Sequence, residues 1–265
     1  MKRLLIIPNV NSVEESLSVA RKYGLGFEFN DFSDPDVLDD EKKIKELTDV
    51  YNTYELPSYR TMHGAFYDVI PFSKDKKIRD ISALRIEQSI KTAKSLGASA
   101  VVFHTNYNPF LNTDTYVDMW IEENTEFWSK ILEKYSDINI YLENMFESSP
   151  DVLERLSEKL CKYANYGVCL DYGHASLSKV SAPEWARRLG RFVKHVHIND
   201  NDLINDLHLS WGEGKIDRDI FYECYKEYMP DATVLIETSA TEDQIRSLEK
   251  MVQEGFADKC DEGMF

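Results

Sequence analysis

Eight short apolar runs alternate with longer helical segments from one end of this sequence to the other. The runs occupy residues 3–8, 25–30, 58–63, 98–104, 139–144, 167–171, 192–198 and 233–238. Strands that alternate with helices are typical of parallel sheets, and eight such units in one series favour a closed barrel over an open doubly wound sheet. The loop after the first run also lacks the G-x-G-x-x-G of nucleotide-binding folds. The sequence therefore predicts an α/β protein with the (β/α)8 TIM barrel fold.

One domain is expected to span residues 1–265. Single α/β barrels routinely reach this length, and a hydrophobic share of 43% is enough for a sizeable core. We find no Pro/Gly/Ser-rich linker, low-complexity segment or charge block that would mark a second domain. The last residues, 255–265, are expected to form a frayed tail.

Two segments carry clear helix signals. Residues 80–98 end at the helix stop Gly97 and place apolar side chains at mostly three-to-four spacing, namely Ile81, Leu84, Ile86, Ile90, Ala93 and Leu96. Residues 148–164 offer Ser149 as an N-cap and Pro150 in the first turn, followed by an amphipathic run.

Composition limits the compartment and the partners. No stretch approaches the roughly 18 uninterrupted apolar residues of a membrane helix, and the first apolar run stops at Pro8, too early for an export signal. The four cysteines form no C-x-x-C pair, which favours reduced thiols and a cytoplasmic protein. A formal net charge of -16 repels phosphate backbones and anionic membranes, so nucleic acid and membrane partners are not expected.

Six of the eight predicted strands end in a residue that can bind a metal or move a proton. These residues are His63, His104, Glu143, Asp171, His197 and Glu237. In a TIM barrel the catalytic face is built from the carboxyl ends of the strands and the loops that follow them. If these positions only met solvent, lysine, serine, threonine and asparagine would compete for them, so the recurrence indicates a functional site.

The last four of these residues predict a metal site. Glu143, Asp171, His197 and Glu237 end neighbouring strands, and their side chains would repel one another and lose hydration without a cation. Carboxylate-rich ligation with one histidine suits Mn²⁺, Mg²⁺ or Co²⁺, whereas more histidine suits Zn²⁺. Additional ligand candidates are His63, His104, His174, Asp206 and His208.

Two aromatic residues near these candidates could have a packing role instead of a role in the site. His195 lies two residues before His197 and so one layer deeper in the barrel, where a hydrogen-bonded interior histidine is the favoured interpretation over a ligand. Trp211, in the segment "SWGEG", can wall the site or pack within its own loop.

The whole pattern resembles the xylose isomerase-like barrels, which include sugar isomerases and epimerases and the endonuclease IV group of abasic-site nucleases. The resemblance runs from "HGAFYD" through "VVFHTNYNP", "YLENMF", "VCLDYGHA", "HVHINDND" and "DLHLSWGEGKID" to "VLIET". It implies a four-ligand metal site at Glu143, Asp171, His197 and Glu237. It also implies that His174 contacts substrate in epimerase-like members, and His104 and Trp211 are the other expected substrate contacts. In nuclease-like members, His63, His104, His174, Asp206 and His208 would ligate further zinc ions.

Three functions remain open at this point. The preferred hypothesis is a metal-dependent isomerase or epimerase of a small sugar or sugar phosphate, in which Glu143 and Glu237 act as the acid–base pair on an enediolate. The first alternative is an endonuclease IV-like zinc phosphodiesterase; however, the loop at residues 32–43 is acidic where a nuclease would need basic residues. The second alternative is a metal-binding barrel without catalysis. Related barrels often form dimers or tetramers, so a homo-oligomer remains an option.

Overall fold

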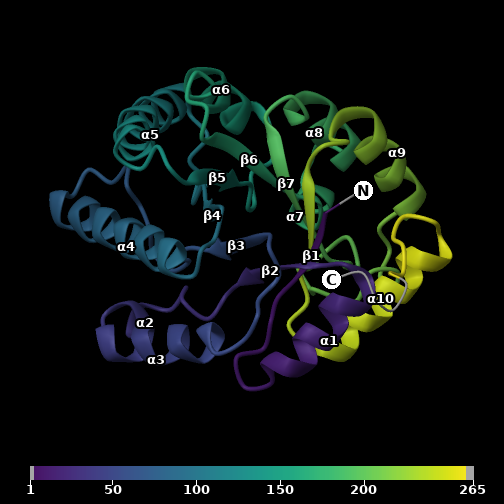
Figure 1. The fold of residues 1–265 in the computed structure, drawn as a ribbon. Helices are drawn as coiled ribbons and strands as arrows, with labels where there is room; N and C mark the ends of the chain where they lie inside the picture. The colour runs from purple at the N-terminus through teal and green to yellow at the C-terminus, as the bar shows by residue number, and fades with distance from the viewer. Residues whose placement is uncertain (1–2, 261–265) are drawn as a thin grey trace.

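Residues 3–260 are described by a computed structural model, in which eight parallel strands form a closed barrel with the helices on its outside (Figure 1). The strands are β1 (Leu4–Ile6), β2 (Gly26–Phe29), β3 (Arg60–His63), β4 (Ala100–His104), β5 (Asn139–Glu143), β6 (Tyr166–Asp171), β7 (Val193–Ile198) and β8 (Thr233–Ile236). The helices are α1 (Val13–Tyr23), α2 (Pro35–Leu38), α3 (Glu41–Asn52), α4 (Lys76–Ser95), α5 (Asp114–Lys134), α6 (Asp151–Leu160), α7 (Tyr172–Ser176), α8 (Ala182–Leu189), α9 (Arg218–Tyr228) and α10 (Thr241–Gln253).

The order of the strands around the barrel is their order in the sequence. Each strand pairs with the next, and β1 closes the ring by pairing with β8, where Leu4 lies opposite Val234. Each of the eight apolar runs overlaps one of these strands, and seven of the runs contain the whole strand; β6 begins one residue before its run. The predicted (β/α)8 TIM barrel is therefore confirmed.

Alternation along the strands divides the core into two layers. Leu4 and Ile6 of β1 belong to the large apolar cluster that the helices cover, whereas Leu5 belongs to a small separate cluster with Leu235. Successive strand residues point to opposite faces of a sheet, so the small clusters fill the inside of the barrel. The inside also holds polar side chains, and these lead to the site described below.

The strand register brings the predicted ligands to one level. His104 lies directly opposite Glu143 across the β4–β5 ladder, and Asp171 lies opposite His197 across the β6–β7 ladder. Because all eight strands are parallel, their carboxyl ends open at the same end of the barrel. We refer to this end as the mouth.

Helix α4 differs from its prediction at the start and on one face. It begins at Lys76, a turn earlier than expected, because the Asp75 side chain accepts a hydrogen bond from the backbone N–H of Lys77 (2.8 Å). Ile81 and Leu84 are 43% and 48% exposed, so their assignment to the apolar face is wrong. The other four predicted apolar positions are buried, since they lie on the side of the helix that faces the strands.

Two predictions at chain boundaries also need correction. Helix α6 begins after Pro150, so Ser149 is not the N-cap; its hydroxyl accepts a weak hydrogen bond from the Asp151 N–H (3.4 Å). The expected frayed tail packs at its start, because Phe256 is buried and stacks on Tyr222 with ring centroids 4.4 Å apart. Residues 261–265 of that tail lie outside the described residues.

Two observations bear on the environment of the chain. All four cysteines are free thiols. Among the described residues, each helix is too short or too polar to span a bilayer.

Candidate metal centre

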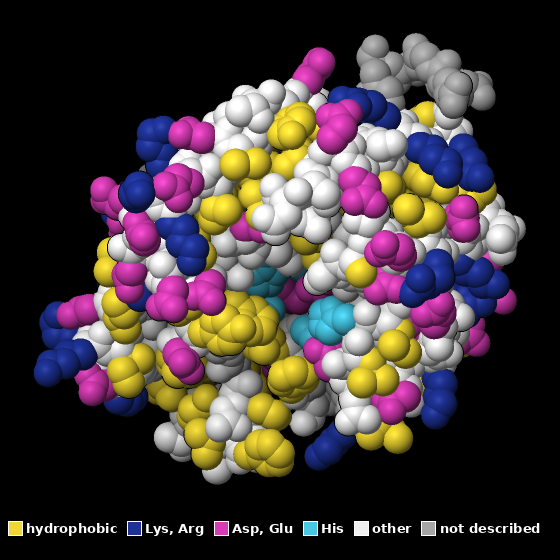
Figure 2. All heavy atoms as spheres, turned by 90° about the horizontal axis from the view of Figure 1, so that it is seen from below, with side chains coloured by type: hydrophobic (Ala, Val, Ile, Leu, Met, Phe, Trp, Pro, Cys, Tyr) yellow, Lys and Arg dark blue, Asp and Glu magenta, His cyan; other side chains and the backbone are white. Residues whose placement is uncertain are grey.

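The nine predicted ligands converge at the mouth of the barrel. Figure 2 looks onto this face and shows histidine side chains at the floor of a hollow, with acidic side chains beside them. The ligand atoms fall into three groups that could each hold a metal ion, and Glu143 belongs to two of the groups.

The central group consists of Glu143, Asp171, His197 and Glu237. Their ligand atoms lie within 4.8 Å of one another. The His197 Nδ1 atom is 3.2 Å from Glu143 Oε1 and 3.5 Å from Glu237 Oε1. Buried Glu143 Oε1, Asp171 Oδ2 and His197 Nδ1 nevertheless have no hydrogen-bond partner among the described residues. Buried polar atoms without partners are costly, and a shared divalent cation would satisfy all three.

The His63 group consists of His63, His104 and Glu143. The Glu143 Oε2 atom lies 3.2 Å from His63 Nε2 and 3.3 Å from His104 Nε2, and both histidines are buried. Because Glu143 Oε1 faces the central group, the two oxygens of this one carboxylate face different groups. Glu143 is therefore placed to bridge two metal sites.

The His174 group consists of His174, Asp206 and His208. Helix α7 supplies His174, and the loop between β7 and α9 supplies the other two residues. The Asp206 Oδ2 atom lies 3.2 Å from the Nε2 atoms of both histidines. Asp206 and His208, two of the additional ligand candidates, thus lie beside His174 at the mouth.

Three histidines use their two ring nitrogens in the same way. The Nδ1 atoms of His63, His174 and His208 hydrogen-bond to backbone carbonyls, at 3.1, 2.9 and 3.1 Å. A carbonyl only accepts, so each Nδ1 carries the proton, and in a neutral imidazole the Nε2 lone pair then faces a carboxylate oxygen. Such a contact is repulsive unless the ring is protonated or a cation lies between the two atoms. This pattern is typical of metal-ligating histidines, whose second nitrogen is held by an acceptor.

The pKa shifts reflect the same crowding. Burial opposes ionisation of Glu143, but the imidazoles of His197 and His104 outweigh it and hold its pKa well below the usual value. Burial and the carboxylates of Glu237 and Glu143 raise the pKa of Asp171 well above its usual value. Burial opposes protonation of His208, yet Asp206 and Glu237 raise its pKa to about 10. In the absence of a metal ion, the raised pKa values of Asp171 and His208 therefore favour protons on the central group and the His174 group.

Sequence reasoning missed Glu28, which lies inside the barrel beneath the central group. Its carboxylate is fully buried, 3.1 Å from His197 Nε2 and 3.0 Å from His195 Nε2. The signal was a charged residue between two phenylalanines in an otherwise apolar strand. His195 itself is buried and hydrogen-bonds to the Thr233 hydroxyl (2.6 Å), as its interior interpretation predicts.

Trp211 does not reach the mouth. Its side chain is 1% exposed, its indole N–H donates to the Tyr222 hydroxyl (3.0 Å), and its ring packs edge-on against Phe221 of α9. The predicted substrate contact is therefore wrong, because the loop directs this ring into the core between α9 and α10. The other two predicted contacts, His104 and His174, do lie at the mouth among the candidate ligands.

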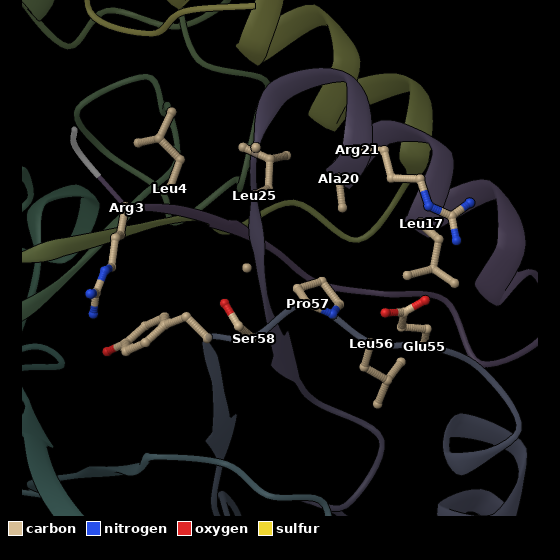
Figure 3. A pocket seen from close by; sticks show the side chains of 13 residues that line it. Arg3, Leu4, Leu17, Ala20, Arg21, Leu25, Glu55, Leu56, Pro57 and Ser58 are labelled. Carbon is tan, nitrogen blue, oxygen red and sulfur yellow. The ribbon is translucent and has the colours of Figure 1, made fainter. Parts of the chain in front are cut away.

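A cavity of about 560 Å³ opens at the opposite end of the barrel (Figure 3). Residues before β1, β2 and β3 line it, among them Arg3, Leu25 and Tyr59, and it contains no candidate metal ligand. In TIM barrels this end serves stability, whereas the carboxyl end carries the chemistry. The site is therefore the mouth rather than this cavity.

Comparisons with known proteins agree with this architecture. An uncharacterized protein of Methanocaldococcus jannaschii is 31% identical over 222 residues, which cover 78% of this chain and 73% of that protein. A Mycobacterium leprae protein named "Probable endonuclease 4" is 28% identical over 211 residues, covering 74% of this chain and 78% of its own.

Solved structures match almost the full chain. The crystal structure of a D-tagatose 3-epimerase-like protein is 26% identical, with a TM-score of 0.74 and 96% of both chains covered. A Thermus thermophilus protein soaked with ZnCl2 is 23% identical, with a TM-score of 0.76 and coverage of 96% of this chain and 97% of its own. The model of the xylose isomerase-like TIM barrel family matches residues 17–255. The chain belongs to the xylose isomerase-like TIM barrel family.

Proposed function

We propose that this chain is a metal-dependent enzyme that hydrolyses a phosphate ester carried on a small sugar. The observation that carries the proposal is the position of Glu143, whose two carboxylate oxygens face different ligand groups. A single-metal isomerase needs only the central group and leaves the His63 and His174 groups without a role. Two-metal sites occur in phosphatases, polymerases and nucleases, as well as in aminopeptidases, so most of the enzyme classes that use them act on phosphate esters.

The side chains of the mouth would hold the cations and the ester between them. Divalent cations there would supply Lewis-acid polarisation of phosphoryl oxygens and a nucleophile at neutral pH. The backbone carbonyls behind His63, His174 and His208 fix these rings with their Nε2 atoms facing carboxylate oxygens, where they would ligate the cations. The name of the Mycobacterium leprae relative, an endonuclease, supports phosphate-ester chemistry, and the epimerase-like name of the solved neighbour supports a small sugar substrate.

The charge of the mouth favours a small ester over a nucleic acid. In the described loops that follow the eight strands, the basic side chains are Lys74, Lys179 and Lys215. Figure 2 shows lysine and arginine side chains mainly at the periphery of this face. Binding of duplex DNA rests on many phosphate contacts from basic residues, and these loops offer few.

A second candidate is a sugar isomerase or epimerase. Glu237 favours it, because this carboxylate belongs to the central group alone and keeps 11% of its side chain exposed at the mouth. With one cation in the central group, Glu143 and Glu237 could remove and return a proton on opposite sides of a carbon atom. The solved D-tagatose 3-epimerase-like neighbour supports this alternative.

Metal counting combined with two assays separates the candidates. Protein purified without added metal should contain close to three divalent ions per chain by mass spectrometry, release inorganic phosphate from sugar monophosphates and hydrolyse 4-nitrophenyl phosphate. Asp206→Asn should lose one ion, and Glu143→Gln should lose more than one. One ion per chain, no ester hydrolysis, and solvent deuterium incorporation into a ketose that Glu237→Gln abolishes would instead establish the isomerase. Bound metal with neither activity would leave a non-catalytic barrel.

A further inference from the structure

A groove of about 410 Å³ adjoins the candidate metal centre, because His174 of the His174 group is one of the residues that line it. Its apolar lining comes from Pro109, Phe110, Phe146 and Leu177, and Lys179 lines it too. A concave site of this size with mainly apolar walls and a few polar groups is typical of small-molecule binding sites.

The two phenylalanines of the groove are unusually exposed. Phe110 is 91% exposed and Phe146 is 52% exposed, and both lie in loops. The Phe146 ring also lies against the His174 ring, with centroids 5.3 Å apart. A ligand that extends from the His174 group into the groove would therefore meet Phe146, and Phe110 lines the same groove.

Exposed aromatic side chains concentrate at this end of the molecule. Among the described residues, the large exposed aromatics are Tyr54, Phe66, Tyr67, Phe110 and Phe146, and all but Tyr54 lie in loops that follow β3, β4 or β5. The space-filling view shows hydrophobic side chains grouped beside the histidines (Figure 2). Single exposed apolar residues are ordinary, but a group of them around a site indicates a ligand or a partner.

We propose that the sugar of the substrate carries a flat aromatic ring, which the groove binds while the polar end of the same molecule is held at the metal centre. The inference depends on the metal centre of the proposed function, but not on which reaction occurs there. An aromatic ring matches the two exposed phenylalanines, because stacked and edge-on ring pairs are favourable beyond the apolar area that they bury. Ser148 lines the same groove, and its hydroxyl can hydrogen-bond to a polar atom on the edge of the ring.

Hydroxamates test the groove independently of the reaction, because the hydroxamate group chelates divalent metals. Binding of acetohydroxamate, benzohydroxamate and phenylacetohydroxamate to the metal-loaded protein is measured by calorimetry. At least one aryl member should bind about tenfold more tightly than acetohydroxamate, since its ring leaves water for an apolar wall. Phe110→Ala removes a side chain that is 91% exposed, so it should fold normally and lose most of this gain.

Leu111→Ala is the matched control, because Leu111 is exposed in the same loop but does not line the groove. It should keep the full aryl gain, while Phe146→Ala should lose it. Equal affinities for all three hydroxamates, or a gain that survives both phenylalanine variants, would overturn the inference without touching the proposed hydrolysis. An aryl gain in a protein that hydrolyses no phosphate ester would overturn the proposed function and leave the groove assignment standing.

Discussion

At the scale of single residues, Glu28 is placed to orient His197. Its Oε1 atom lies 3.1 Å from His197 Nε2, on the side of the ring opposite the atom that faces Glu143. A carboxylate behind a metal-ligating imidazole fixes the ring and its tautomer and increases the basicity of the ligating nitrogen. Burial opposes ionisation of Glu28, but His197 and His195 outweigh it and lower its pKa, so the carboxylate is charged.

Glu28→Gln should therefore weaken metal binding while the barrel still folds. The amide retains the shape of the side chain but removes the negative charge that lies 3.0–3.1 Å from two imidazole nitrogens, and its NH2 group can only donate. Loss of such a partner typically costs about 10- to 100-fold in metal affinity. Competition with a fluorescent chelator measures this affinity.

Thr61→Val provides the comparison for Glu28→Gln. It removes the hydroxyl that donates to Glu28 Oε2 (2.5 Å) but leaves both imidazole contacts in place. Its effect on metal affinity should be much smaller. Wild-type affinity in Glu28→Gln would rule out an orienting role for this carboxylate.

Residues at strand ends could be predicted from the sequence, whereas residues that depend on packing could not. Glu143 and His197 end apolar runs, so a barrel of parallel strands places them together without knowledge of the loops. The contact of Glu28 with His197 could not be predicted, because no local sequence pattern shows that the Glu28 side chain of β2 lies beneath β7. The position of Trp211 could not be predicted either, because it depends on the path of its loop, which turns the ring away from the mouth and toward α9.

At the scale of the elements, the loop between β7 and α9 carries Asp206 and His208 and is organised around Asp200. The Asp200 carboxylate accepts backbone hydrogen bonds from Asn201 (2.9 Å), Gly212 (2.9 Å) and Ile216 (3.0 Å). Its backbone also pairs with Leu209 in both directions. One buried side chain thus holds both ends of the segment that delivers two of the three residues of the His174 group.

Gly214→Ala should loosen this loop. A Cβ at position 214 would lie 2.2 Å from Asp200 Oδ1 and 2.4 Å from the Asn201 carbonyl oxygen, so the backbone must shift. Steric overpacking of this kind costs about 1–3 kcal/mol. Thermal unfolding should show a lower Tm, and metal analysis should show preferential loss of the ion of the His174 group.

Glu213→Ala in the same turn is the control for Gly214→Ala. Glu213 is exposed and forms an ion pair with Arg246 (2.9 Å), and exposed pairs contribute about 0–1 kcal/mol. Its Tm and metal content should stay close to those of the wild type. A full metal complement and an unchanged Tm in Gly214→Ala would contradict the organising role of Asp200.

The elements themselves were predicted with unequal success for physical reasons. Strands were found because each is a short apolar run buried on both faces, which the sequence displays directly. The predicted starts of α4 and α6 differ from the observed ones by a few residues, because several neighbouring residues can serve as an N-cap. The N-caps in the structure are Asp75 for α4 and Pro150 for α6. The start of the tail packs because Phe256 meets Tyr222, a contact between segments distant in sequence.

At the scale of the whole molecule, the site concentrates negative charge in a protein that already carries a formal net charge of -16. Four carboxylates and five histidines supply the three ligand groups. Without metal, protons on the histidines offset part of this repulsion, as the raised pKa values of His174 and His208 indicate. Metal ions and protons therefore compete for the same histidine nitrogens and carboxylate oxygens.

This competition predicts that a rise in pH destabilises the metal-free protein and enlarges the stabilisation that metal binding gives. A histidine whose pKa is raised by folding, such as His208 at about 10, stabilises the metal-free fold fully below its unfolded pKa of 6.5. That contribution is lost as the pH rises toward about 10, and the raised pKa of Asp171 acts in the same direction. Between pH 6.5 and 9 the metal-free protein should therefore become less stable as the pH rises.

The metal-loaded protein should gain stability over metal-free protein as the pH rises, because each displaced proton costs less at higher pH. At a free ion concentration 100 times Kd, binding at one site adds about 2.7 kcal/mol, or about 5–10 °C in Tm for a chain of this size. Calorimetric Tm values at pH 6.5 and 8.5, with free zinc fixed by a metal buffer, should show a larger metal-induced increase at the higher pH. Glu143→Gln should lose most of this increase, since it removes a ligand from two groups. An increase in Tm that is independent of pH would mean that zinc binds without displacing these protons.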